Sequence, residues 1–142
     1  MVENITHNNL VLSIIIRADY YKNGISFFTP ENFSQQLGYM NRPQGYIIPP
    51  HVHNLVPREV TLTQEVLYIK SGKLRVDFYD NDKNYLQSSI LYKGDVILLA
   101  QGGHGFEMLE ESEMIEIKQG PYCGEEDKVR FDHIETHHIV IK

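Results

Sequence analysis

The feature that most limits the folds open to this sequence is a succession of short apolar runs separated by turn residues. From residue 45 onward, seven runs of four to seven residues read as strands: Tyr46–Val52, Glu65–Ile69, Lys73–Tyr79, Ser88–Leu91, Val96–Leu99, Gly105–Leu109 and Met114–Lys118. Gly, Asn and Asp gather between them, where turns need them. Strands this short and closely spaced are typical of an antiparallel sandwich or barrel and not of a parallel sheet.

The N-terminal third predicts two further strands and one helix. The strands are Leu10–Ala18 and Ile25–Phe28, both rich in aliphatic or aromatic residues. For the helix, Thr29 provides an N-cap and Pro30 suits the first helical position. An apolar face with helical spacing follows, formed by Phe33, Leu37 and Met40. We therefore expect one short helix that lies against a sheet and ends before Pro43.

Length and charge exclude several classes of protein. The 142 residues suit a single domain, residues 1–142. The formal net charge of −6 offers no basic stripe for phosphates, so we expect no nucleic-acid partner. The single cysteine, Cys123, allows no internal disulfide. The apolar run Leu10–Ile16 is far shorter than the roughly 20 residues that cross a bilayer, and it lacks signal-peptide features. A cytoplasmic protein with no membrane partner is the expectation.

Two histidines separated by one residue suggest a metal site. On a strand, side chains alternate between faces, so His51 and His53 would point the same way with attachment points about 6.6 Å apart. Two imidazoles at this distance can converge on one cation at about 2.1 Å per bond. The preceding Pro49-Pro50 pair restricts the approach of the chain.

Two other polar side chains stand at the ends of apolar rows. Glu65 shares one face of its predicted strand with Leu67 and Ile69, and His104 precedes a second row of the same kind. A carboxylate on an inward face is costly unless a cation or a hydrogen-bond donor pairs with it. Glu65 and His104 are therefore candidates for the same site as the histidine pair.

These residues lie in two stretches that resemble the paired motifs of the cupin superfamily. The first stretch reads Gly45-x5-His51-x-His53 and then Glu65-x6-Gly72; the second reads Gly94-Asp95-x6-Gly102-x-His104-Gly105-Phe106. Together they span a core of residues 45–108. The resemblance implies an all-β double-stranded β-helix, a jelly-roll barrel. It also implies that His51, His53, Glu65 and His104 hold one divalent transition metal, whether Zn, Fe, Mn, Ni or Cu.

The sequence departs from the cupin pattern at two points. Eleven residues, 54–64, separate the second histidine from Glu65, where cupins usually have three or four, and Glu59 lies nearer the usual gap. Glu65 is preferred because the spacing to Gly72 matches. Ala100 replaces a common proline, with one residue fewer before His104.

The long loop between the ligands is expected at the mouth of the barrel. Arg58 on this loop is a candidate clamp for an anionic small-molecule ligand. The other candidate pocket residues are Gln44, Tyr46 and Phe106.

The resemblance leaves several functions open. The leading interpretation is a metal-dependent isomerase or epimerase acting on a small polar, carbohydrate-like metabolite, as in small cupins of polysaccharide biosynthesis. An iron-dependent dioxygenase and a non-catalytic small-molecule-binding protein are the alternatives. A related class, the metal-free nucleotide-sugar ketoisomerases, uses histidines of a similar barrel as bases and needs no complete set of ligands.

The C-terminal tail and the strand edges carry the last expectations. His133, His137 and His138 read as residues of a solvated tail, because their spacing fits no convergence between strands. Small barrels of this type often pair through strand edges, so a homodimer is expected. The apolar runs Leu10–Ile16 and Ile139–Ile141 are the candidate edges.

Overall fold

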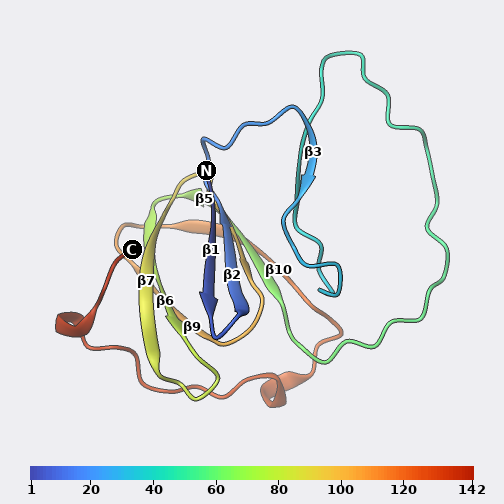
Figure 1. The fold of residues 1–142 in the computed structure, drawn as a ribbon. Coiled ribbons are helices and arrows are strands. Elements are labelled where there is room, and N and C mark those ends of the chain that lie inside the picture. The colour runs from blue at the N-terminus through green and yellow to red at the C-terminus, as the bar shows by residue number, and fades with distance from the viewer.

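Ten strands and two short 3-10 helices make up the computed structural model, which describes all of residues 1–142 (Figure 1). The strands are β1 (Val2–His7), β2 (Leu10–Ile16), β3 (Gly24–Phe27), β4 (Gly38–Asn41), β5 (Glu65–Ser71), β6 (Lys73–Tyr79), β7 (Tyr85–Tyr92), β8 (Val96–Leu99), β9 (Gly103–Met108) and β10 (Glu113–Lys118). The 3-10 helices, η1 (Gly124–Asp127) and η2 (Thr136–His138), lie in the C-terminal tail. No helix is long and apolar enough to span a membrane.

The strands form two main sheets and a separate hairpin. The larger sheet has the order β1-β2-β8-β5-β10, and the smaller has the order β7-β6-β9. The strands β3 and β4 pair only with each other. Every pairing between strands is antiparallel, which confirms the all-β class expected from the sequence.

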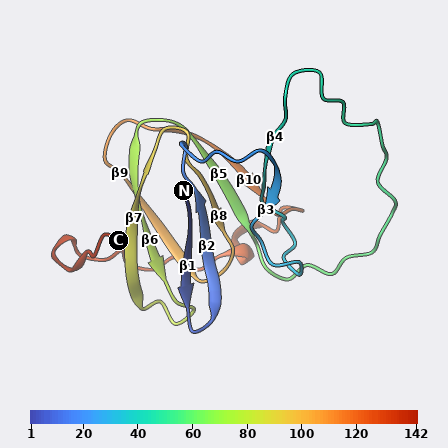
Figure 2. The ribbon, with the colours of Figure 1, turned by 45° about the horizontal axis from the view of Figure 1, so that its top comes forward.

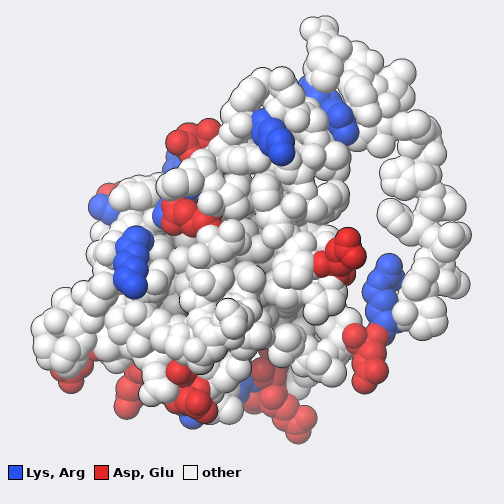
Figure 3. All heavy atoms as spheres, in the orientation of Figure 1, with Lys and Arg blue, Asp and Glu red and all other residues white.

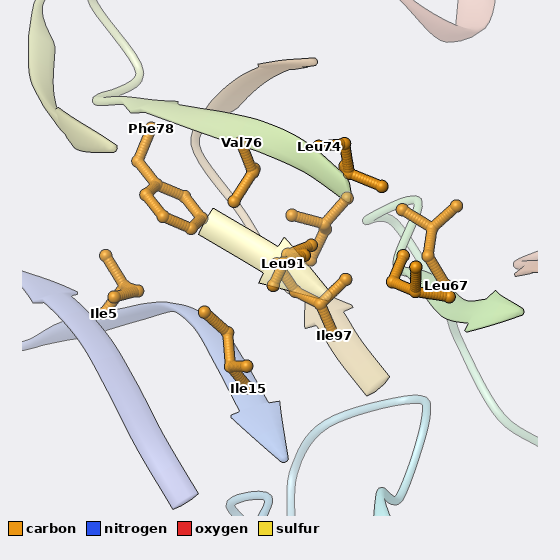
Figure 4. Packing of buried hydrophobic residues seen from close by; sticks show 10 residues of the cluster. Ile5, Ile15, Leu67, Leu74, Val76, Phe78, Leu91 and Ile97 are labelled. Carbon is orange, nitrogen blue, oxygen red and sulfur yellow. The ribbon is translucent and has the colours of Figure 1, made fainter. Parts of the chain in front are cut away.

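One hydrophobic core joins the two main sheets. The alternating residues Leu74, Val76 and Phe78 of β6 are buried and face the larger sheet, where Ile15 and Ile97 pack against them (Figure 4). Alternate residues of a strand face the same side, so the opposite faces of both sheets are left for solvent or other segments. The functional groups discussed below therefore lie either at the end of this core or on the outer faces.

The outer face of the smaller sheet carries a buried ion pair and is covered by the C-terminal tail. Arg75 donates to both carboxylate oxygens of Asp77, at 2.7 and 3.0 Å. Residues Val140 and Lys142 exchange backbone hydrogen bonds with Ser88 of β7, at 2.8 and 3.0 Å. The end of the tail thus adds a short parallel bridge to the edge of this sheet.

The helix expected after Thr29 is absent, and that prediction was wrong. Residues 30–37 form turns and bends, because side chains compete with the helical backbone bonds. The buried Gln64 side chain accepts hydrogen bonds from the Ser34 hydroxyl and the Gln35 amide. Gly38 then begins β4. The apolar residues of the segment still pack on the larger sheet, where Leu37 contacts the cluster of Ile14, Leu98 and Ala100.

The strand expected at Tyr46–Val52 is also absent. Residues 42–64 form an irregular loop that extends away from both main sheets (Figures 1 and 2). The loop contains four prolines, which lack the backbone N–H needed for hydrogen bonds between strands. The Pro49-Pro50 pair lies within the predicted strand itself.

The remaining predicted strands are found, most with ends shifted by a few residues, and β1 and β4 were not predicted.

Neither of the two apolar runs expected to form a subunit edge is free to pair with another chain. The strand β2, Leu10–Ile16, has β1 on one side and β8 on the other. The run Ile139–Ile141 lies along β7 of its own chain.

The turn before β9 gives a test of the fold with a matched control. Gly102 has φ of +76°, and a Cβ there would lie 2.6 Å from the Tyr79 carbonyl oxygen. We expect Gly102→Ala to lower the free energy of unfolding by about 1–3 kcal/mol in urea denaturation. Gly105→Ala should cost much less, because a Cβ at Gly105 meets nothing within 4 Å. Equal losses would contradict this backbone geometry.

Candidate functional site

Glu65 and His104 meet where the two main sheets face each other. Glu65 begins β5 of the larger sheet, and its face leads into the core residues Leu67 and Ile69. His104 lies on β9 of the smaller sheet, opposite the core residue Phe78. The His104 Nε2 and Glu65 Oε2 atoms are 3.1 Å apart, and the side chains are 31% and 12% exposed. The pair is therefore half-buried and accessible from one end of the sandwich.

A lysine and a second carboxylate extend this pair. Lys118 of β10 lies directly opposite Glu65 in the strand register, with its Nζ 3.7 Å from Glu65 Oε1. The same Nζ lies 2.7 Å from Asp127 Oδ2 in η1. Thr63 donates its hydroxyl to Asp127 at 2.5 Å. A continuous row of polar groups thus ties the tail to the start of β5.

A cavity of about 460 Å³ opens beside the His104–Glu65 pair, with the tail as its outer wall. Only three of its 14 lining residues are hydrophobic. The lining residues are Thr63, Glu65, Tyr79, residues 102–105 and residues 127–133. Its volume falls in the range of small-molecule sites, and its lining offers a ligand both polar groups and apolar surface.

The charges around Glu65 hold its carboxyl group in the ionised form. The hydrogen bond from His104 lowers the pKa of Glu65, and the positive charges of Lys118 and Lys128 lower it further, against the opposing effect of burial. The pKa of Asp127 is likewise lowered, first by its contact with Lys118 and then by Thr63. Two carboxylates therefore face the open end of the core as anions at neutral pH.

This shift in pKa predicts an acid-dependent loss of stability. A lowered carboxyl pKa stabilises the fold above the unfolded-state value of about 4.5, and the benefit disappears as the pH falls through the lower folded-state value. We expect Glu65→Gln to cost roughly 1–2 kcal/mol at pH 7, and progressively less as the pH falls below 4.5, by urea denaturation at each pH. Glu59→Gln, at an exposed position without an ion pair, is the control. A cost of Glu65→Gln that is independent of pH would contradict the assignment.

The structure does not bring His51 and His53 to this cavity. Both are exposed on the loop of residues 42–64, with ring centroids 5.2 Å apart. The His51 Nδ1 atom lies 3.0 Å from the Pro49 carbonyl oxygen. Apart from these two histidines, residues 43–57 of the loop hold no Lys, Arg, Asp or Glu, and most of the long loop is white in Figure 3. Of the four predicted metal ligands, only Glu65 and His104 therefore lie beside the cavity.

The other predicted binding residues also lie away from the cavity. Gln44, Tyr46 and Arg58 are exposed on the same loop, where Tyr46 stacks under Arg42 with 4.5 Å between guanidinium and ring centroid. Phe106 points inward and packs against the hydrophobic core. The prolines of the loop explain the placement of Tyr46, since the expected strand Tyr46–Val52 would have carried its side chain toward the barrel mouth.

The residue Glu59, weighed above as an alternative ligand, is exposed on the loop as well. It lines a second cavity of about 400 Å³ together with Asn9, Phe33 and Gln101. This second cavity contains no histidine, and it lies at the start of β2.

Sequence reasoning missed Lys118, Asp127 and the tail that walls the cavity. Lys118 shares its face of β10 with Met114 and Glu116, while the apolar Ile115 and Ile117 take the outer face, so strand parity would have placed Lys118 outside. The position of Asp127 had no signal in strand parity. It depends on how the polar segment after β10 folds back.

The arrangement is suited to binding a small polar molecule and to moving a proton on it. His104 offers an imidazole oriented by a carboxylate, which is the usual way to fix the tautomer of a catalytic histidine. Glu65, Lys118 and Asp127 supply fixed charges of both signs close by. Comparison with known proteins found no match, since no family model, curated protein or solved structure is detectably similar to this chain.

Proposed function

We propose that this chain is a cupin-type protein that binds a small, carbohydrate-like metabolite beside His104 and catalyses a proton transfer on it. The reaction would be an isomerisation or an epimerisation. The observation that carries the proposal is the 3.1 Å contact between His104 Nε2 and Glu65 Oε2 at the edge of this cavity. Oriented imidazoles of this kind are common general bases.

The turn geometry of the motif-like segments supports the assignment to a double-stranded β-helix of the cupin type. Gly72, Gly94 and Gly102 stand at motif positions, and each has a positive φ between +76° and +91°. Asp95, which follows Gly94, is buried and accepts hydrogen bonds from the Ala18 and Tyr92 amides. The motif residues thus act as turn formers, which is the role that the resemblance implies for them.

The roles within the site follow from the contacts. A hydrogen bond from Nε2 of His104 to Glu65 favours the tautomer in which Nδ1 is unprotonated, so Nδ1 can accept a proton. His104 would take a proton from a carbon next to a carbonyl group, leaving an enediolate, and return it to the neighbouring carbon while the hydroxyl proton moves between the two oxygens. In an epimerisation, water would supply a proton to the opposite face and then take up the proton that His104 holds. Glu65 orients the ring and stabilises the positive charge that develops on it. Lys128 and Arg130 line the cavity and suit anionic or carbonyl oxygens of the ligand.

Metal binding by His51, His53, Glu65 and His104 stays a prediction. The cavity offers one imidazole and one carboxylate of this set, whereas catalytic zinc sites use three protein ligands. The cavity is also lined by His133, Asp127 and Asp132, but none of them joins Glu65 and His104 in a group of three potential ligand atoms, so the residues beside the cavity do not make a complete metal site and the reaction proposed here includes no metal step.

The homodimer and the cytoplasmic location also stay proposals. An apolar patch on the outer face of the larger sheet supports the dimer, since Tyr68, Ile115 and Ile117 are exposed side by side in the β5–β10 register. We expect light scattering at micromolar concentration to give about twice the monomer mass, and Ile115→Lys to shift the protein toward monomer. A wild-type protein that stays monomeric would contradict the dimer.

The proposed reaction is tested by incubating the protein with a panel of keto-sugars in deuterated water. Proton transfer at carbon predicts deuterium at the position next to the carbonyl group, or a new isomer, detected by NMR and mass spectrometry. Thermal stabilisation by a sugar without deuterium exchange would indicate that the protein binds the sugar but does not catalyse the reaction. If no sugar in the panel gives either thermal stabilisation or exchange, the carbohydrate assignment is contradicted.

A further inference from the structure

A second group of metal-binding side chains lies on the C-terminal tail, apart from the cavity. Glu135, His137 and His138 each place one potential ligand atom within 4.8 Å of the other two. The His137 Nε2 and Glu135 Oε2 atoms are 3.3 Å apart, and the two imidazole centroids are 3.9 Å apart. The spacing of these residues fits no strand, but the 3-10 turn η2 brings all three side chains to one place.

The backbone that carries this group is fixed at both ends. The Ile134 amide donates to the Tyr79 hydroxyl at 3.0 Å, and the Val140 amide donates to the Tyr85 hydroxyl at 2.9 Å. Within the turn, the His138 amide donates to the Glu135 carbonyl oxygen at 2.9 Å. The three ligands therefore stand on a turn held against β6 and β7, and ordering the backbone adds little to the cost of binding a cation.

We propose that Glu135, His137 and His138 bind one Zn²⁺ ion. Two imidazoles and one carboxylate are donors that zinc accepts in proteins, whereas calcium and magnesium prefer oxygen ligands alone. Bonds of about 2.1 Å in a tetrahedral arrangement place ligand atoms roughly 3.4 Å apart. The side chains of Glu135 and His137 are 72% and 67% exposed, so small rotations can close the remaining gap.

The exposure of Glu135, His137 and His138 also determines how tightly the site would bind zinc. Three protein ligands leave a fourth position for water, and solvent competes for the ion, so binding in the micromolar range is expected in place of the tight binding of buried structural zinc. The adjacent residues 127–133 wall the cavity beside His104. A bound ion would therefore stiffen the segment that leads from the cavity to the end of the chain.

Equilibrium dialysis of the full chain against Zn²⁺, followed by elemental analysis, tests the site. We expect the double substitution His137→Ala/His138→Ala to remove one bound zinc per chain or to weaken its binding at least tenfold. Glu135→Gln should weaken the same binding by a smaller factor. Circular dichroism should show unchanged folding, because all three side chains are exposed.

Two control variants make the outcome decisive. His133→Ala changes another exposed histidine of the same tail outside the group, and His51→Ala/His53→Ala removes the pair on the long loop. Zinc binding that survives both controls and is lost in the His137/His138 variant supports the proposal. Binding that is unchanged in the His137/His138 variant, or that is lost equally in His133→Ala, would overturn it.

Discussion

Replacement of Asp77 by alanine is expected to lower the free energy of unfolding by about 3–5 kcal/mol. Asp77 accepts two hydrogen bonds from Arg75 and one from the Ser88 hydroxyl, and the Arg75 and Asp77 side chains are 8% and 4% exposed. The substitution leaves a buried guanidinium with only Glu107 as a charged partner. The Glu107 side chain is 56% exposed and bonds only one guanidinium nitrogen, so the buried charge of Arg75 would lose most of the contacts that compensate for its lost water.

Urea denaturation followed by circular dichroism measures this effect, with Asp82→Ala as the control. Asp82 is exposed on the β6–β7 turn, and its replacement should change the stability by less than about 0.5 kcal/mol. Adding Arg75→Met to Asp77→Ala should recover part of the loss, because the buried positive charge is removed as well. A loss below 1 kcal/mol for Asp77→Ala would show that the tail does not bury this face.

The largest effect on activity is expected from His104→Gln. General base catalysis by a positioned histidine contributes about 10²–10⁴-fold to the rate, and glutamine cannot accept the proton. We therefore expect deuterium incorporation into the responsive keto-sugar to fall at least 100-fold. Glu65→Gln should lower the rate by a smaller factor, because it removes the group that orients the ring and keeps the ring itself.

The control for this activity is His7→Gln, on β1 and outside the cavity lining, which should leave the exchange rate unchanged. The rates are measured at saturating sugar, so that a change in affinity is separated from a change in the chemical step. Exchange in His104→Gln at more than a tenth of the wild-type rate would exclude this histidine as the proton carrier.

The strands were the part of this fold that the sequence predicted well. Runs such as Lys73–Tyr79 and Val96–Leu99 alternate or are fully apolar, and they become β6 and β8 with the same bounds. The strand β1 was missed because Val2–His7 mixes polar residues with few apolar ones. It is a strand because it pairs with β2 and because Ile5 enters the core, which is a tertiary effect.

The segment 29–64 was predicted poorly, because contacts between distant residues decide its structure. Phe33 and Leu37 have helical spacing, and both do pack on the larger sheet. The buried Gln64, however, lies 30 residues along the chain from Ser34 and binds the backbone that a helix would have used. Local sequence propensity predicts neither the contact of Gln64 with this segment nor the lack of strand hydrogen bonds around Pro49-Pro50.

The sequence likewise predicted some residues of the candidate site and missed others. Parity along two strands placed Glu65 and His104 at the ends of inward-facing rows, and they lie in contact across the core. The histidine pair at residues 51 and 53 depended on a strand that did not form. Asp127 reaches the site through the fold of the tail, for which the sequence has no periodic signal.

The central claim is that Glu65 pairs with His104 and with no other histidine. Long-range ¹H–¹⁵N NMR spectra of the seven imidazoles, compared between wild type and Glu65→Gln, test it most directly. The contact predicts that the His104 ring signals shift strongly while those of His51 and His53 stay in place. Unchanged His104 signals, or an equal shift of all three histidines, would contradict the pairing described here.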